Sequence, residues 1–286
     1  MVEFESNFGA SAIYSGIPMA NYLAHPAVSN SNLSNILRSP AFAEYDKAHP
    51  RGDTDATALG TAIHMAILEP ERFEEHYQLD PTDENGGYHH GWRNTKAYKA
   101  AKGDILAHGF QILKQSDLDS CRHICENVWN SAIGHDVLSI ADDNEVSVLV
   151  DDPEYDLMRK IRPDVVVTAA NMLVDIKKTR DIRPSAFARD CASFGYHRTA
   201  AWYLDTANLA WDDAQFHHYL FLVVADTPPH EIRGYTLDAE SVEFGRAQYR
   251  DLLCQWAQCA AEGVWPGSSG RVEELSLPRW VFNQEV

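Results

Sequence analysis

The spacing of apolar residues along the chain predicts several helices. Apolar side chains recur three or four residues apart, as they do on one face of a helix, in segments 33–37, 58–69, 184–192, 196–208 and 239–262. Residues 96–133 show the same spacing and predict one or two helices, with breaks at Gly103 and Gly109. The polar stretch 41–57 and the stretch 79–95, rich in Gly, Asp, Asn and His, are expected to be loops.

The spacing changes after Gly134, where apolar runs of strand length begin. The predicted strands are 145–150, 157–167, 172–177, 218–225 and, as a possible edge strand, 231–237. Helices therefore precede, interrupt and follow the strands. This order predicts one α/β domain with helical elements at both ends.

Two of these strands carry charged residues that a hairpin would bring together. If the strands on either side of the turn at 168–171 pair with each other, Asp164 lies opposite Asp175. Because side chains alternate along a strand, Lys177 shares the face of Asp175, and Arg162 shares that of Asp164. One face would then present two carboxylates, a lysine and an arginine.

A second hairpin would add another carboxylate to this face. The turn Asp152–Tyr155 can close a hairpin in which Glu145 lies opposite Arg162. Carboxylates directly opposed in a sheet repel each other, and a divalent cation removes that repulsion. Such a cation activates water for hydrolysis of a phosphodiester, while Lys177 stabilises the developing charge or helps to deprotonate the water. The Asp-x-Lys pattern by itself is common, so the prediction depends on the cross-strand position of Asp164.

Several further motifs accompany this site. In chain order they are Tyr22–Ser29, Ser31–Leu33, Ser39–Pro40, Leu59–Pro70, Arg162–Asp164, Val174–Thr179, Phe194–His197 and Ala200–Tyr203. Together they resemble the ordered motifs of the RecE-type exonuclease (exonuclease VIII) family, within the PD-(D/E)XK nuclease superfamily. The resemblance covers about residues 15–225. It is carried by the order and spacing of all the motifs.

The resemblance implies a restriction-endonuclease-like core with a central mixed sheet flanked by helices. It also implies Mg²⁺, or Mn²⁺ as a substitute, and 5′ to 3′ degradation of one strand from double-stranded DNA ends. Relatives commonly form ring-shaped homo-oligomers, possibly tetramers, and act with a single-strand annealing recombinase in phage-type recombination and DNA repair. A single nuclease domain would divide into an N-terminal segment, a catalytic core and a C-terminal helix and tail, at 1–57, 58–238 and 239–286.

The resemblance also assigns roles to residues of the site. His64, Asp164 and Asp175 correspond to metal ligands, the backbone carbonyl of Ile176 to a fourth ligand, and Lys177 to the catalytic lysine. Related nucleases use an additional glutamate whose position varies. Two residues compete for that role, Glu145 and, on the preceding helix, Glu126. The alternation of side chains along the predicted strand directs Glu145 toward the site and so favours it for this role.

DNA contacts are expected from four residues near these motifs, which are Arg162, Tyr196, Thr199 and Tyr203. Thr199 departs from the family pattern, which has glutamine there, and this leaves the contact with the strand end open. Arg93 and Lys96 lie in a segment that mixes cations with aromatic residues, a composition typical of nucleic-acid contacts.

Charge, cysteine content and hydropathy limit the alternatives. A formal net charge of -18 argues against a general nucleic-acid binder, unless the basic residues gather on one surface. The five cysteines include no CxxC pair, so we expect reduced thiols and no iron–sulfur cluster. We expect no membrane segment and a cytoplasmic, bacterial or phage-encoded protein. Two other hypotheses remain open: a RecB-family nuclease acting on single-stranded or flap DNA, and a non-catalytic DNA-binding assembly protein with the same fold.

Overall fold

A five-stranded mixed sheet forms the centre of the protein, for which a computed structural model describes residues 9–49, 55–83, 86, 87, 91–268, 270, 272, 274–277 and 279–282. The strand order is β10-β9-β8-β7-β4, and only β8 and β9 run parallel. The strands are β4 (Asp143–Asn144), β7 (Val165–Val167), β8 (Met172–Thr179), β9 (His218–Ala225) and β10 (Ile232–Tyr235).

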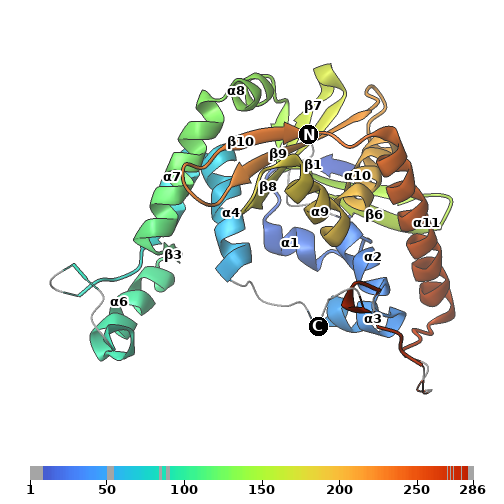
Figure 1. Ribbon diagram of the computed structural model, residues 1–286, viewed down its shortest axis with the longest axis horizontal. Coiled ribbons are helices and arrows are strands. Elements are labelled where there is room, and N and C mark those ends of the chain that lie inside the picture. Colours follow the sequence, from blue (N-terminus) through green and yellow to red (C-terminus); the bar gives the residue numbers. More distant parts are fainter. Residues whose placement is uncertain are drawn as a thin grey trace.

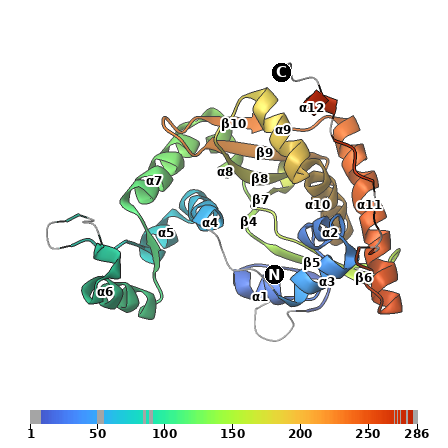
Figure 2. The same cartoon turned by 60° about the horizontal axis from the view of Figure 1, so that its bottom comes forward.

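Helices cover both faces of this sheet (Figures 1 and 2). On one face lie α4 (Asp55–Leu68) and α7 (Gln115–Asn130); on the other lie α9 (Pro184–Phe194) and α10 (Tyr196–Ala210), with α11 (Ala239–Glu262) packed against α10. Because side chains alternate along the buried strand β8, this strand contributes to the hydrophobic cores on both faces of the sheet. Its Val174 and Ile176 pack in the cluster that includes α4 and α7, whereas Leu173 packs in the cluster that includes α9, α10 and α11.

A second, three-stranded sheet has the order β1-β5-β6. It contains β1 (Ala12–Tyr14), β5 (Ser147–Asp152) and β6 (Leu157–Ile161), and the chain near it forms α1 (Met19–Ala24), α2 (Asn30–Ile36) and α3 (Pro40–Ala48). The chain leaves the central sheet after β4, builds β5 and β6, and returns for β7. The two crossings touch, because the Glu145 amide donates a hydrogen bond to the Asp164 carbonyl at 3.0 Å. We call this junction the seam.

The remaining elements include a projection from the compact core (Figures 1 and 2). They are α5 (Pro70–His76), β2 (Tyr77–Leu79), η1 (Trp92–Asn94), α6 (Lys96–Ala107), β3 (Gln111–Leu113), α8 (Ala132–Leu138), η2 (Thr168–Ala170) and α12 (Arg279–Phe282). β2 and β3 pair in parallel, and η1 and α6 lie between them along the chain. We call residues 91–114 the arm.

Most predicted elements are confirmed. The strand at 218–225 and the helix at 239–262 have the predicted bounds, and β10 is an edge strand. The hairpin register is also confirmed, because Val165 pairs with Val174 and Val167 with Met172. Among the described residues, no helix is both long enough and apolar enough to cross a membrane.

Two predictions about helices and loops are wrong. The stretch 41–57, expected to be a loop, contains most of α3, because Ser39 caps this helix by accepting a hydrogen bond from the Phe42 amide and Pro40 occupies its first turn. Residues 50–54 lie outside the described residues. Gly103 lies inside α6 and does not break it, whereas Gly109, with φ of +85°, follows the helix end.

The predicted strand 157–167 is two strands in different sheets, β6 and β7. The register of its first hairpin is also wrong by two residues, since Val148 pairs with Ile161 and Val150 with Arg159. A count along the sequence assumes one continuous ladder, and the chain instead changes sheets at Arg162–Asp164.

Candidate metal centre

Three side chains from separate parts of the chain converge at the seam. His64 of α4, Glu145 and Asp164 each offer one donor atom, and these atoms all lie within 4.8 Å of one another. Carboxylate oxygens suit Mg²⁺ and Mn²⁺, and imidazole is a common ligand of transition metals. The donor set therefore fits a divalent cation of this kind.

His64 and Asp164 both contact the backbone of Ile176. The Nε2 atom of His64 lies 2.9 Å from the Ile176 carbonyl oxygen, and its Nδ1 lies 3.4 Å from Oδ1 of Asp164. Asp164 accepts a 2.6 Å hydrogen bond from the Ile176 amide. The structure thus brings the predicted ligands His64, Asp164 and the Ile176 carbonyl together, although His64 and Ile176 are 112 residues apart in the sequence.

The pKa values of His64 and Asp164 move in opposite directions. Burial favours neutral His64, but the Asp164 carboxylate outweighs this effect and raises the imidazole pKa. Burial likewise favours neutral Asp164, but His64 and Lys177 lower its pKa. Each side chain therefore favours the charged form of the other.

Asp175 and Lys177 form a second pair beside the first. Lys177 Nζ lies 2.6 Å from both Asp175 oxygens, and its hydrogen bond goes to Oδ1. Asp175 is only 8% exposed, and the Lys177 ammonium compensates its charge. Two buried carboxylates, Asp164 and Asp175, beside one ammonium group form a donor set that suits a divalent cation.

The charge of Lys177 is supported by its surroundings. Burial favours the neutral amine, but Asp175 and Asp164 together raise the lysine pKa above its usual range. Burial and the nearby Asp164 raise the pKa of Asp175. Lys177 Nζ also lies 5.1 Å from the centroid of the Tyr196 ring.

Glu145 reaches the centre from a connection between two strands, and not from the strand in which it was predicted. It lies between β4 and β5 with a left-handed φ of 50°, outside both strands. Its carboxylate accepts a 3.1 Å hydrogen bond from Nη2 of Arg162. The other terminal nitrogen of Arg162, Nη1, donates to the Ile17 carbonyl and to Ser147 Oγ. The predicted cross-strand pairing is wrong, but the crossing between sheets still brings Glu145 to the predicted cluster.

The competing glutamate, Glu126, lies elsewhere. It is an exposed residue of α7 and does not belong to the three-residue donor cluster. The arrangement therefore favours Glu145 over Glu126 as the additional acidic ligand.

A groove of about 350 Å³ opens beside the donor atoms. His64, Glu145, Asp164, Arg162 and Tyr203 line it, together with residues of α1 and α4. Because the Arg162 side chain is only 11% exposed and holds Glu145, it acts here mainly as a positioning residue. The Tyr203 hydroxyl donates a long, 3.4 Å hydrogen bond to the Arg162 carbonyl.

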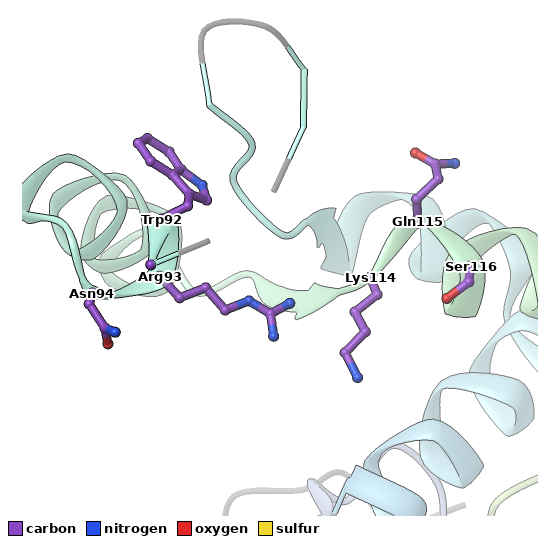
Figure 3. A pocket seen from close by; sticks show the side chains of 7 residues that line it. Trp92, Arg93, Asn94, Lys114, Gln115 and Ser116 are labelled. Carbon is purple, nitrogen blue, oxygen red and sulfur yellow. The ribbon is translucent and has the colours of Figure 1, made fainter. Parts of the chain in front are cut away.

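Thr199 and the two predicted arm residues lie apart from the donors. Thr199 Oγ1 accepts a 2.8 Å hydrogen bond from Asn30 and so joins α10 to α2. Arg93 and Lys96 belong to the arm, and Arg93 pairs with Asp80 at 2.6 Å. Arg93 lines a pocket of about 560 Å³ at the start of the arm (Figure 3).

Sequence analysis missed one residue of this centre, Tyr219 of β9. Its buried hydroxyl lies close to the Asp175 carboxylate. Burial and the nearby Asp175 carboxylate raise its pKa well above the usual value. Strand alternation could have found it only if the parallel pairing of β8 with β9 had been known.

The five cysteines are free thiols carried by three helices. Cys121 and Cys125 lie on α7, Cys191 on α9, and Cys254 and Cys259 on α11. Cys254 is exposed and Cys125 is partly buried, whereas the other three are buried.

Comparison with known families identifies the chain at the level of its superfamily. Residues 29–278 match the profile of the PDDEXK-like domain of unknown function (DUF3799). The chain belongs to this family. The predicted PD-(D/E)XK superfamily and its α/β fold class are thereby confirmed, and a nuclease, a hydrolase acting on nucleic acids, is supported.

A crystal structure from Eubacterium rectale, described as a "Putative exonuclease", has the same fold. It aligns with a TM-score of 0.59 and 10% sequence identity over 93% of this chain and 95% of the other. At this identity the likeness concerns the fold alone. No curated protein sequence matches the chain. Members of the PD-(D/E)XK superfamily generally use divalent metals, which agrees with the donor cluster at the seam.

Proposed function

We propose that this protein is a Mg²⁺-dependent DNA exonuclease of the RecE-like type, acting on double-strand ends from 5′ to 3′. The observation that carries the proposal is the convergence of His64, Glu145 and Asp164 beside the Asp175–Lys177 pair. Its product would be a single-stranded overhang for phage-type recombination.

His64, Glu145, Asp164, Asp175 and the Ile176 carbonyl would hold the cation, with Mn²⁺ as a substitute for Mg²⁺. When bound, the cation acts as a Lewis acid toward the phosphodiester and makes water a better nucleophile. The Ile176 amide already positions Asp164 through a 2.6 Å hydrogen bond. His64 would bind the cation as the neutral imidazole, which requires its contact with Asp164 to be given up.

Lys177 contributes a positive charge in this proposal. Asp175 and Asp164 raise its pKa and favour the ammonium form, whose positive charge would stabilise negative charge on the phosphate. Tyr196 supports the lysine from its other side. Arg162 positions Glu145 through the contact at the seam.

Action at DNA ends is supported by three features. The motifs resemble RecE-type exonucleases, the fold matches a protein described as a "Putative exonuclease", and the candidate centre is present at the seam. The same resemblance supports a cytoplasmic homo-oligomeric ring such as a tetramer, and a single-strand annealing recombinase as partner.

A second candidate is a nuclease that acts on single-stranded or flap DNA. Phe194 favours it, because this side chain is 64% exposed and its ring stacks on Tyr196 at 5.7 Å, next to Lys177. An exposed aromatic residue in this position suits an unpaired base.

Digestion of linear, nicked and closed-circular duplex DNA in Mg²⁺ tests the proposal, with Asp175→Ala as the inactive control. We expect degradation of the linear form only. Cleavage of closed circles at the same rate would contradict the exonuclease assignment, and full activity of the variant would contradict the site. A preference for single-stranded DNA would favour the second candidate. Light scattering reports the mass of the oligomer.

A further inference from the structure

The arm has a charge opposite to that of the whole protein. Residues 91–114 contain five cationic side chains, Arg93, Lys96, Lys99, Lys102 and Lys114, and one carboxylate, Asp104. The complete chain has a formal net charge of -18. All five cations are exposed. Such segregation of charge is required if an acidic protein is to bind a polyanion.

The lysines of the arm are available for an external ligand. Within the described part of the chain, no carboxylate forms an ion pair with Lys96, Lys99, Lys102 or Lys114. The first three lie three residues apart on α6, so they form a stripe along one side of the helix. Tyr98 is the buried residue of α6, and Lys102 shares its side of the helix, where both line a second pocket.

The arm also forms a pocket with the features of a nucleotide-binding surface. The pocket measures about 560 Å³ and is lined by Trp92, Arg93, Asn94 and Lys114 among others. In Figure 3 the Arg93 side chain extends from η1 toward Lys114. The Trp92 indole is fixed by a 2.8 Å hydrogen bond to the Pro81 carbonyl. On such a surface the cations bind phosphates and the aromatic ring stacks on a base.

A neighbouring pocket leads from the arm to the helix of the metal centre. It measures about 260 Å³, and Arg93, Lys102 and Lys114 line it together with Ala58 and Leu59 of α4. Asp80 and Asp117 also line this pocket, and Asp80 is engaged by Arg93 and Tyr98. Gly60 and His64, which lie on a different side of α4, line the groove of the metal centre. The two pockets therefore open on different sides of the same helix.

We propose that the arm binds the sugar–phosphate backbone of DNA and guides it toward α4, the helix that carries His64 of the metal centre. This inference rests on the proposed function, because that function makes DNA the substrate. Beyond the predicted contacts at Arg93 and Lys96, it assigns backbone binding to Lys99, Lys102 and Lys114. The fixed indole, and the pocket that reaches from the arm to α4, favour DNA over an acidic protein as ligand.

The test measures binding without cleavage. A fluorescein-labelled blunt duplex is titrated in EDTA with the full-length protein and with the variant Lys99→Gln/Lys102→Gln/Lys114→Gln, between about 50 and 200 mM salt. We expect Kd to increase about tenfold or more, and the slope of log K against log salt to fall in magnitude by about 2 to 3, or about 0.9 for each lost phosphate contact. The Lys→Arg triple variant should keep the wild-type slope.

A matched control removes two exposed cations that already have carboxylate partners. Arg72 pairs with Glu69 and Arg122 with Glu74, so Arg72→Gln/Arg122→Gln should leave Kd and the salt slope unchanged. An unchanged slope in the lysine variant, with an unaltered circular dichroism spectrum, would overturn the inference. So would a lower oligomer mass in that variant, which would assign the arm to contacts between copies. Since EDTA prevents metal-dependent cleavage, binding by the arm and failure of the proposed nuclease activity are separate results.

Discussion

The metal centre and the arm differ in how their charged side chains are placed. At the centre, ionisable groups are mostly buried and arranged as two pairs, His64 with Asp164 and Lys177 with Asp175. In the arm, cations lie on the surface of one helix and its flanking turns. Buried charges require partners, whereas exposed charges are solvated by water and remain available for a ligand. The net charge of -18 describes neither region.

The difference also concerns how each region is built. The centre depends on the position of α4, the seam and β8 together, so one substitution alters several contacts. The arm presents independent side chains, so the effect of each should be small and additive. The predictions below test this contrast, beginning with the largest expected effect.

Asp175→Ala should abolish the nuclease activity, with a fall in rate of about a thousandfold or more, because the cation loses a ligand and Lys177 loses its partner. Digestion of linear duplex DNA in Mg²⁺ measures it. Lys177→Met should give a similar loss without reducing the affinity for metal. A rate within tenfold of wild type for either variant would show that the pair is structural.

Glu145→Gln should weaken Mn²⁺ binding by about ten- to a hundredfold, since the donor cluster loses a charged oxygen. Isothermal titration calorimetry without DNA gives the affinity. Glu126→Gln is the matched control and should bind Mn²⁺ like wild type, because this residue lies on the exposed side of α7. The opposite pattern would assign the additional ligand to Glu126.

Arg162→Met should reduce the free energy of unfolding by about 2 kcal/mol, because it leaves Glu145 and the Ile17 carbonyl without their donor. Urea denaturation provides the measurement. The Arg162→Lys variant should recover part of the loss, since one amine cannot satisfy all three acceptors. Stability equal to wild type would mean that Glu145 is held in place by the backbone of the seam alone.

Lys96→Gln should weaken DNA binding only a few fold at low salt and reduce the salt slope by about one unit, as expected for one phosphate contact. Fluorescence anisotropy in EDTA measures both quantities. A loss as large as that of the triple lysine variant would contradict the additive behaviour expected of the arm.

The smallest effect should come from a surface pair outside both regions. Arg122 lowers the pKa of Glu74 through their hydrogen bonds, so the pair stabilises the fold at neutral pH, and this stabilisation is lost as the pH falls through the lowered carboxyl pKa. Arg122→Gln should cost about 0.5 kcal/mol at neutral pH and nothing in acid, given the exposure of both side chains. Thermal unfolding of both proteins as a function of pH measures this. A stability difference between wild type and variant that stays constant with pH would contradict the electrostatic origin.

The local part of the centre could be predicted from the sequence. Asp164, Asp175 and Lys177 lie on one hairpin, where a short turn and alternation of side chains determine the register. The bounds of β9 and α11 were equally predictable, because both have continuous patterns and clear ends. The helix α3 was missed because Ser39–Pro40 marks its start as well as it marks the end of the preceding helix.

The rest depended on tertiary structure. No pattern in the chain indicates that it changes sheets at Glu145 and again at Arg162–Asp164, although this change brings Glu145 to the metal centre. His64 lies on a helix whose sequence only shows which face is buried, and its packing on β8 decides that it meets the Ile176 carbonyl. The sequence by itself therefore determined the chemistry of one hairpin. Packing between distant segments decided the remaining ligands, because their separation along the chain leaves their distance in space undetermined.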